Sequence, residues 1–370
     1  REAEKTWGGQ PENRCNGKMI LCRRSKKNRL NTVLLLEGEG SLSRMSACLQ
    51  SRGGKKIFLL HGAHFVTGAS QFLEGSVLPC ERYIKKGSNV HTEEVEEVWS
   101  LYQASGANAI VAIGGGSVID LGKMMVWQSL QQKLSLPLLA AAPTTTGSGS
   151  ESTRFAVLYE HKKKLSISHP SLLPSIVALD PMLVYSQSSY QAAVSGMDVL
   201  AQAVESYWSR ASVPASKKLA AAAIAIWKEH FIPGLDASNK DARKLMQIAA
   251  NLAGQAIDQT RTTGPHALSY YLTSVHGVAH GQAVAFFLPV FFDYNQPGPE
   301  LLRVLGVQTK EEAALMIREK MVQAGLAIHL SAIGIDKNKI VDQLLADVNT
   351  ERFGNNPVLF DGQVLRALLL

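Results

Sequence analysis

The stretch that decides the fold is Ala112-Ile-Gly-Gly-Gly-Ser-Val-Ile-Asp120. Apolar residues 109–113 lead into the three glycines, and a helical pattern runs from Val118 to Gln131. This order predicts a strand, a tight turn and a helix. Glycine lets the backbone approach a ligand where a Cβ would clash, and the N–H groups at the helix start then face an anion such as a pyrophosphate. The same pattern also occurs in turns that bind nothing, and it is not the GxGxxG of an ordinary dinucleotide fold.

A second loop rich in small residues follows the next apolar run. Residues 136–142 are apolar, and Pro143-Thr-Thr-Thr-Gly-Ser-Gly-Ser-Glu151-Ser-Thr153 comes directly after them. Hydroxyl groups at this density make a loop that can wrap a phosphate or a ribose. The second loop favours a nucleotide site over an empty turn.

Strands and helices alternate up to residue 181. Alternation of this kind predicts a mostly parallel sheet covered on both faces. The expected strands are 32–36, 55–60, 83–84, 109–113, 136–142 and 176–179, and the expected helices are 42–50, 65–73, 93–105 and 118–131.

The pattern then changes. Residues 155–159 and 164–168 predict a hairpin across a basic turn, and from residue 189 onward the apolar spacing is helical. The predicted class is therefore an α/β dinucleotide-binding domain with a mostly parallel sheet, followed by an all-helical metal-binding domain. The predicted boundaries are an N-terminal extension at 1–30, the α/β domain at 31–181 and the helical domain at 182–370.

Composition is that of a globular enzyme. Hydrophobic residues make up 46% and charged residues 19% of the 370 residues, which is too apolar for disorder. No apolar run reaches the roughly 18 residues that a membrane helix needs. The polar start Arg1-Glu-Ala-Glu-Lys5 does not resemble a signal peptide, and Cys15, Cys22, Cys48 and Cys80 form no CxxC pattern. We read the cysteines as free thiols and expect a cytoplasmic protein without a membrane partner.

The net charge of +7 is uneven. Arg23-Arg-Ser-Lys-Lys-Asn-Arg29 holds five positive charges in seven residues. A nucleic-acid or membrane patch is one reading. A solvated N-terminal extension is favoured, because no aromatic residues interleave with the charges; we expect no nucleic-acid partner. The remaining positive charge suits an anionic cofactor and substrate.

Four polar side chains have spacings that could place them around one metal ion. Asp198 and Gln202 are four residues apart and share a helix face. His266 and His280 follow in a later helical stretch. A carboxylate, an amide oxygen and two imidazoles suit Fe(II) or Zn(II). Spacing alone leaves an N-cap and a ligand equally open for Asp198, and for each histidine it favours an ordinary core residue or a cap over a ligand.

Together, the two loops resemble the iron-containing (group III) alcohol dehydrogenase family, which has the dehydroquinate synthase-like fold, and Asp198, His266 and His280 match its metal-ligand motif. The resemblance runs from about residue 31 to the C-terminus. It implies that GGGSxxD cradles the pyrophosphate, that the PTTxGxGSE loop lines the nicotinamide side, and that the metal ligands are an aspartate and three histidines. It also implies an assembly of two or more copies, and we expect a homodimer. The cofactor residues carried over are Gly62, Gly114, Gly115, Gly116, Ser117, Asp120, Thr144, Thr145, Ser148 and Lys164.

This chain departs from the family pattern at two places. Gln202 stands where most members have a histidine ligand, and Tyr270 stands where many have a histidine beside the substrate. These residues, with phrases such as Pro-His-Ala-Leu-Ser-Tyr270, resemble the phosphonoacetaldehyde reductase branch. The lesser alternative is that Gln202 is an ordinary polar residue in a site that has lost its metal.

The resemblance implies reduction of 2-phosphonoacetaldehyde to 2-hydroxyethylphosphonate. Asp198, His266 and His280, with Gln202, would hold Fe(II), with Zn(II) as the alternative, and Tyr270 or a water would return the proton. Arg154 and Arg261 are candidates for the anionic group, because guanidinium binds such oxyanions in a bidentate way.

The predicted preference between NADPH and NADH depends on Gly62. A carboxylate at this position would repel the 2′-phosphate of NADPH, and glycine has none. We therefore expect NADPH, with NADH also accepted, and His61 or Lys56 as helpers. The alternatives are another small aldehyde or alcohol of the lactaldehyde or propanediol type, a dehydroquinate synthase-like cyclase, and a binding protein without activity.

Overall fold

Apolar runs buried on both faces form the centre of a seven-stranded sheet. The computed structural model describes residues 18–21, 32–160 and 163–370. The sheet has the strand order β1-β2-β9-β6-β5-β3-β4, and only the β1–β2 pairing is antiparallel. The strands are β1 (Lys18–Leu21), β2 (Thr32–Glu37), β3 (Ile57–Gly62), β4 (Cys80–Lys85), β5 (Ala109–Gly114), β6 (Leu138–Pro143) and β9 (Ile176–Leu179).

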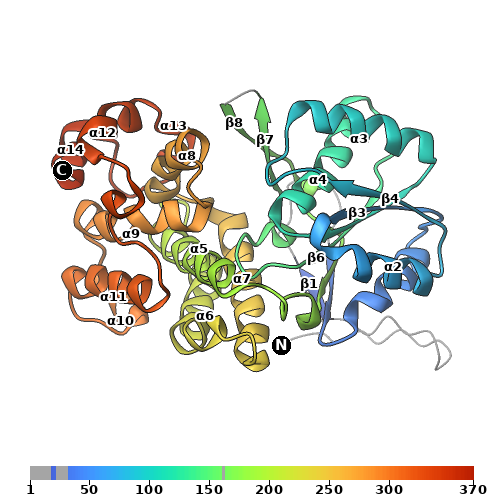
Figure 1. The fold of residues 1–370 in the computed structure, drawn as a ribbon, viewed down its shortest axis with the longest axis horizontal. Coiled ribbons are helices and arrows are strands. Elements are labelled where there is room, and N and C mark those ends of the chain that lie inside the picture. The colour runs from blue at the N-terminus through green and yellow to red at the C-terminus, as the bar shows by residue number, and fades with distance from the viewer. Residues whose placement is uncertain (1–17, 22–31, 161–162) are drawn as a thin grey trace.

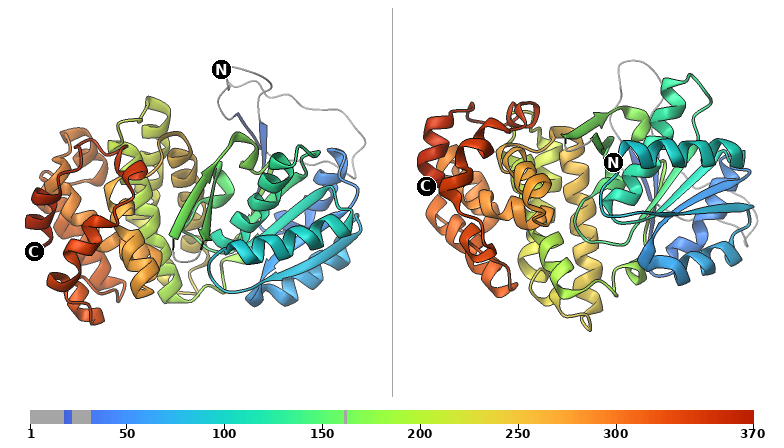
Figure 2. Two further views of the ribbon diagram at one scale, coloured as in Figure 1. Left: turned by 90° about the horizontal axis from the view of Figure 1, so that it is seen from above. Right: turned by 45° about the horizontal axis from the view of Figure 1, so that its top comes forward.

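Helices cover both faces of this sheet. α1 (Met45–Ser51) and α2 (Val66–Gly75) share one apolar cluster with the sheet. α3 (Thr92–Ser105) and α4 (Gly116–Gln131) share the cluster on the other face. The predicted hairpin is present as β7 (Phe155–Glu160) and β8 (Lys163–Ser168), and it lies between the sheet and the helices that follow it (Figures 1 and 2).

Everything after β9 is helical, as the pattern predicts. The largest apolar cluster of the described residues lies here and contains Trp227, Phe287 and Phe291. The predicted class, an α/β domain with a mostly parallel sheet followed by a helical domain, is confirmed (Figure 1). The helices are α5 (Ser189–Trp208), α6 (Pro214–His230), α7 (Lys240–Thr260), α8 (Gly264–His276), α9 (His280–Asn295), α10 (Pro299–Leu305), α11 (Lys310–Gln323), α12 (Lys337–Ala346), α13 (Thr350–Phe353) and α14 (Gly362–Leu369).

Strand register brings the two glycine-bearing loops together. Gly114, the last residue of β5, pairs with Pro143, the last residue of β6. Since parallel strands end at the same edge of a sheet, both loops leave from adjacent points. The strands alone therefore place the two loops side by side.

A glycine pair joins the second loop to the helical domain. Gly149 has a φ of 59°, in the left-handed region that favours glycine. A Cβ added at Gly254 on α7 would lie 2.7 Å from the Gly149 carbonyl oxygen. The two backbones are thus in direct contact, with no room for a side chain at Gly254.

The N-terminal region differs from the sequence prediction in two ways. Residues 18–21, assigned to an extension, form the edge strand β1, because the apolar run Met19-Ile20-Leu21 pairs with the open edge of β2. Cys48 is disulfide-bonded and Cys80 is free. The prediction of free thiols is therefore wrong for Cys48, since a disulfide joins residues that no local spacing marks. The cysteines thus no longer support the cytoplasmic prediction.

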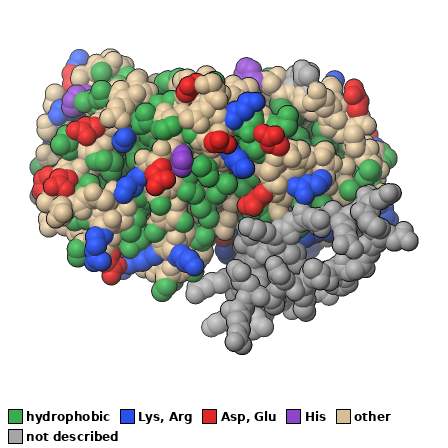
Figure 3. Space-filling model, turned by 90° about the horizontal axis from the view of Figure 1, so that it is seen from below, with side chains coloured by type: hydrophobic (Ala, Val, Ile, Leu, Met, Phe, Trp, Pro, Cys, Tyr) green, Lys and Arg blue, Asp and Glu red, His purple; other side chains and the backbone are tan. Residues whose placement is uncertain are grey.

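Residues 1–17 and 22–31, with the basic run, Cys15 and Cys22, lie outside the described residues. Within the described part, no helix has the length and hydropathy that crossing a bilayer requires. On the face drawn in Figure 3, acidic and basic side chains are intermingled.

We expect Gly254→Ala to lower the free energy of unfolding by about 1–3 kcal/mol, because the added methyl group meets backbone that cannot move aside. Urea unfolding of the purified protein measures this. The matched control is Gly75→Ala at the end of α2, where an added Cβ meets nothing within 4 Å. Equal stability of the two variants would contradict the glycine contact.

Candidate active site

The glycine turn of the quoted stretch opens α4. Gly115 is the N-cap and Gly116 the first helical residue. A Cβ on Gly116 would lie 2.8 Å from the Ser148 hydroxyl oxygen, and the Thr144 N–H donates to the Gly114 carbonyl at 3.1 Å. The two loops therefore pack directly on each other and leave the first N–H groups of a long helix facing the space beyond, a geometry that suits a phosphate.

A buried lysine that the sequence reading did not single out anchors the second loop. The Lys123 ammonium donates to the Ser150 hydroxyl at 2.9 Å, the Thr153 hydroxyl at 3.1 Å and the Phe155 carbonyl at 2.5 Å. It lies 3.6 Å from Asp120. Burial lowers the pKa of Lys123, and the nearby carboxylates oppose that effect. The sequence could have indicated Lys123, because it lies three residues after Asp120 on the same helix face.

Asp120 has a structural role in this arrangement. Its carboxylate accepts hydrogen bonds from the Ser150 hydroxyl at 2.5 Å and the Val157 N–H at 3.0 Å. It therefore ties α4 to the second loop and to β7. The sequence predicts Asp120 at the cofactor, and Asp120 does line the cavity described below.

Three predicted metal ligands meet at one point in the helical domain. Donor atoms of Asp198 on α5, His266 on α8 and His280 on α9 all lie within 4.8 Å of one another. His266 Nε2 is 3.2 Å from Asp198 Oδ1. The histidine rings are 5.3 Å apart, centroid to centroid. This donor set is suited to a divalent transition metal.

Glu205 supports this cluster from behind and was not predicted. It is fully buried and contacts His266 Nδ1. It also accepts from the Thr263 N–H at 2.6 Å and the Thr263 hydroxyl at 2.9 Å. Glu205 lies seven residues after Asp198, on the same face of α5, which was the signal available in the sequence. A carboxylate behind a histidine fixes the ring's orientation and tautomer.

Two buried polar atoms beside the cluster have no hydrogen-bond partner among the described residues, namely Gln202 Oε1 and His280 Nδ1. The Gln202 amide nitrogen donates to the carbonyls of Gly147 and Ser148, both at 3.3 Å. Since buried polar groups are rarely left unpaired, an orphaned amide oxygen at this point is consistent with a further ligand at the cluster.

The electrostatics of the histidines differ. Burial alone would lower the pKa of His266, but the carboxylates of Glu205 and Asp198 raise it to about 10. Burial and the charge of Lys164 lower the pKa of His280 to about 3. Without a metal, His266 is therefore charged and His280 is neutral at neutral pH.

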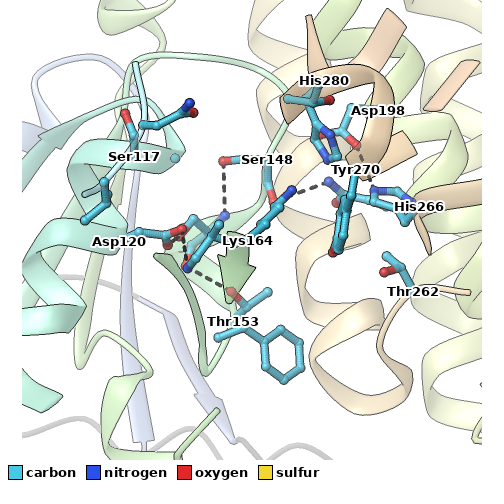
Figure 4. Close-up of a pocket in the computed structure, with 18 of the residues that line it drawn as sticks. Ser117, Asp120, Ser148, Thr153, Lys164, Asp198, Thr262, His266, Tyr270 and His280 are labelled. Carbon is cyan, nitrogen blue, oxygen red and sulfur yellow. Dashed lines mark hydrogen bonds and ion pairs between the residues drawn. The ribbon is translucent and has the colours of Figure 1, made fainter. Parts of the chain in front are cut away.

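A cavity of about 230 Å³ joins the glycine turn to this cluster. Figure 4 shows Ser117, Asp120 and Ser148 on one side of it and Asp198 and His280 on the other. The predicted residues that line it are Gly116, Ser117, Asp120, Ser148, Lys164, Asp198, Gln202, His266, Tyr270 and His280. The other predicted cofactor residues, Gly62, Gly114, Gly115, Thr144 and Thr145, are not among those that line this cavity.

Lys164 and Tyr270 lie together in this cavity. The Lys164 ammonium is 3.7 Å from the centroid of the Tyr270 ring, a cation–π distance. The Tyr270 ring is 6.3 Å from that of His280. Burial alone would raise the pKa of the Tyr270 hydroxyl, but the charges of Arg352 and Lys164 lower it below its ordinary value.

The structure does not bring Arg154 and Arg261 to this cavity. Arg154 pairs with Asp258 at 2.5 Å, and Arg261 pairs with Glu351. Both line a separate cavity of about 260 Å³. The guanidinium group in the cavity is that of Arg352, which the sequence reading missed.

The proposed cofactor helpers also lie elsewhere. Lys56 precedes β3, at the opposite end from Gly62, and pairs with Glu81 at 2.5 Å. His61 is fully buried in β3, so its side chain is not displayed at the edge of the sheet.

Comparison with known proteins matches this architecture. The family model for iron-containing alcohol dehydrogenase matches residues 34–181, and the model for the C-terminal part of the Fe-containing alcohol dehydrogenase family matches residues 192–369. A solved structure of sulfoacetaldehyde reductase from Bifidobacterium kashiwanohense, in complex with NAD+, is 27% identical. It has a TM-score of 0.84 and covers 91% of this chain and 96% of its own.

Two curated relatives have different activities in their names. Phosphonoacetaldehyde reductase from Streptomyces viridochromogenes is 30% identical over 71% of this chain and 75% of its own length. Choline dehydrogenase from Bacillus subtilis is 32% identical over 60% of this chain, and the match spans 61% of that protein.

We expect Lys123→Met to lower the free energy of unfolding by about 3–5 kcal/mol, because Asp120 then stays buried without its cation. Hydrogen exchange should also become faster at residues 148–155. The control is Lys133→Met, an exposed lysine just beyond the same helix. Unchanged stability of Lys123→Met would show that the lysine does not anchor the loop.

Proposed function

The chain belongs to the iron-containing alcohol dehydrogenase family, and from this premise we propose that it transfers hydride between a nicotinamide dinucleotide and a small aldehyde or alcohol. Members of this family are oxidoreductases acting on CH–OH groups. The observation that carries the proposal is the single cavity with the glycine turn on one wall and the Asp198–His266–His280 cluster on the other.

The residues present fit both groups that this chemistry requires. Asp198, His266 and His280 would hold Fe(II), and the orphaned Gln202 oxygen fits a fourth ligand. The glycine turn at the start of α4 would hold the pyrophosphate. Iron supplies Lewis-acid polarisation of a carbonyl, and the nicotinamide supplies the hydride.

The chain's own residues prepare these groups. Glu205 holds His266 by Nδ1, which leaves Nε2 directed at the cluster. Gln202 holds the second loop through its amide nitrogen, so its oxygen stays free for the cluster. We propose that Tyr270, whose hydroxyl pKa is lowered by nearby cations, gives a proton to the product alkoxide.

We propose 2-phosphonoacetaldehyde as the substrate and 2-hydroxyethylphosphonate as its product. The support is the similarity to phosphonoacetaldehyde reductase and the presence of Gln202 and Tyr270, which resemble that branch. We further propose that NADPH is accepted beside NADH, because Gly62 offers no carboxylate to repel a 2′-phosphate.

The first experiment is oxidation of NADPH or NADH by iron-loaded protein, with 2-phosphonoacetaldehyde beside propanal. We expect a kcat/KM advantage for the phosphonate of about 100-fold, or about 2.7 kcal/mol. Asp198→Ala should abolish turnover. Equal kcat/KM values for the two aldehydes would support the dehydrogenase activity and contradict the phosphonate substrate. No reduction of any aldehyde by protein with both groups bound would overturn the proposal.

A second prediction concerns pH. Below the His266 pKa of about 10, a metal ion must displace a proton, whereas His280 is already neutral. Affinity for Zn(II), an air-stable probe, should therefore rise about tenfold per pH unit between about pH 6 and 8. Isothermal titration calorimetry at several pH values measures it.

Glu205→Gln removes the carboxylate that raises the pKa of His266. The affinity for Zn(II) should then depend less steeply on pH. Glu229→Gln, on an exposed side chain of α6, is the control and should keep the slope. A parent affinity that does not change with pH would contradict the ligand assignment for His266.

A further inference from the structure

Two cations face the cavity without a carboxylate partner. Arg352 is 6% exposed, and among the described residues neither Arg352 nor Lys164 forms an ion pair. Arg352 Nε is buried without a hydrogen-bond partner, and the other neighbouring guanidinium groups, Arg154 and Arg261, are each paired with a carboxylate. An unpaired buried charge is costly unless a ligand completes it.

The fold holds these two cations at fixed positions. Arg352 Nη2 donates to the Ser166 hydroxyl at 2.8 Å, and the Arg352 guanidinium lies 5.3 Å from the Phe155 ring centroid. Ser166 lies two residues after Lys164 on β8, so both side chains share one face, with Cα atoms roughly 7 Å apart. The hairpin therefore presents the ammonium and the guanidinium to the same part of the cavity.

Charge in the cavity favours an anionic occupant. A divalent metal would balance the carboxylates of Asp198 and Glu205, and Asp120 is already matched by Lys123. Lys164 and Arg352 then remain uncompensated. Since Lys164 lies over the ring of Tyr270, which is beside His280, the cations lie next to the cluster.

We propose that Arg352 and Lys164, with Ser166, form an oxyanion subsite that selects short aldehydes carrying a phosphonate or sulfonate group. The inference rests on the proposed reductase and assigns its substrate selectivity to residues of β8 and α13. Guanidinium and ammonium together match a tetrahedral oxyanion. The cofactor pyrophosphate is the other source of such an anion, but it has its own cradle at the start of α4.

The test compares the parent with Arg352→Gln and Arg261→Gln. Both variants remove a guanidinium that lies over Phe155, but only Arg352 lines this cavity. For Arg352→Gln we expect kcat/KM to fall about 10- to 100-fold with 2-phosphonoacetaldehyde and sulfoacetaldehyde. Activity with propanal and the KM for the reduced cofactor should stay within about twofold. Arg261→Gln should keep the parent's preference.

A binding measurement separates this inference from the proposed reaction. Ethylphosphonate should bind metal-free protein saturated with NAD+ by calorimetry, and binding should weaken by a similar factor in Arg352→Gln. Ser166→Ala, which removes the hydroxyl that holds Arg352 Nη2, is the second variant if Arg352→Gln does not fold, as judged by circular dichroism.

Each outcome decides one question. The subsite would be overturned if Arg352→Gln lowered kcat/KM equally for propanal or raised the KM for the reduced cofactor. It would also be overturned if Arg261→Gln lost the parent's preference for the phosphonate. Absence of ethylphosphonate binding to the parent would also overturn it. If the parent reduced propanal and phosphonoacetaldehyde equally well, the subsite would be overturned and the proposed reductase activity would stand. Arginine-dependent ethylphosphonate binding without reduction of any aldehyde would support the subsite and overturn the proposed function.

Discussion

The active-site region depends on one fully buried carboxylate. Glu205 has no access to water, so neighbouring hydrogen-bond donors must offset the cost of burying its charge. Thr263 supplies its N–H and its hydroxyl, and Trp208 in turn donates to that hydroxyl at 2.9 Å. These bonds fix the start of α8 against α5. His266, two residues into α8 and also in contact with Glu205, therefore reaches Asp198 in one orientation. The position of the Asp198–His266–His280 cluster therefore depends on the hydrogen bonds that satisfy this carboxylate.

The fold was largely readable from the sequence, because its signals are local. Apolar runs followed by loops of small residues indicated β5, β6 and the start of α4, and the 3.6-residue spacing indicated α6 and α7. Asp198, His266 and His280 were found through the family motif, since their spacing alone also fits caps and core residues. β1 was missed because four residues carry little pattern, and its pairing depends on an edge that only the folded sheet provides.

The second layer of the site could not be read in this way. Arg154 and Arg261 were chosen for being near the loop and His266 in sequence, yet both have carboxylate partners. Arg352 lies 186 residues from its partner Ser166, a separation that no local pattern spans. Lys123 and Glu205 could have been identified from the sequence, because each lies on the same helix face as a predicted residue, Asp120 and Asp198 respectively. A buried charge on the same face as a candidate ligand is a reason to include it in a site.

Two of the contacts between the α/β part and the helices differ in kind. Gly149 and Gly254 meet backbone to backbone, so no side-chain rotation can lengthen that contact. Ser166 and Arg352 meet through one hydrogen bond between side chains, which can break and re-form. The separation of the second loop and α7 is therefore fixed at the glycine contact. An anion bound by both Lys164 and Arg352 would add a link between β8 and α13 that the hydrogen bond alone does not provide.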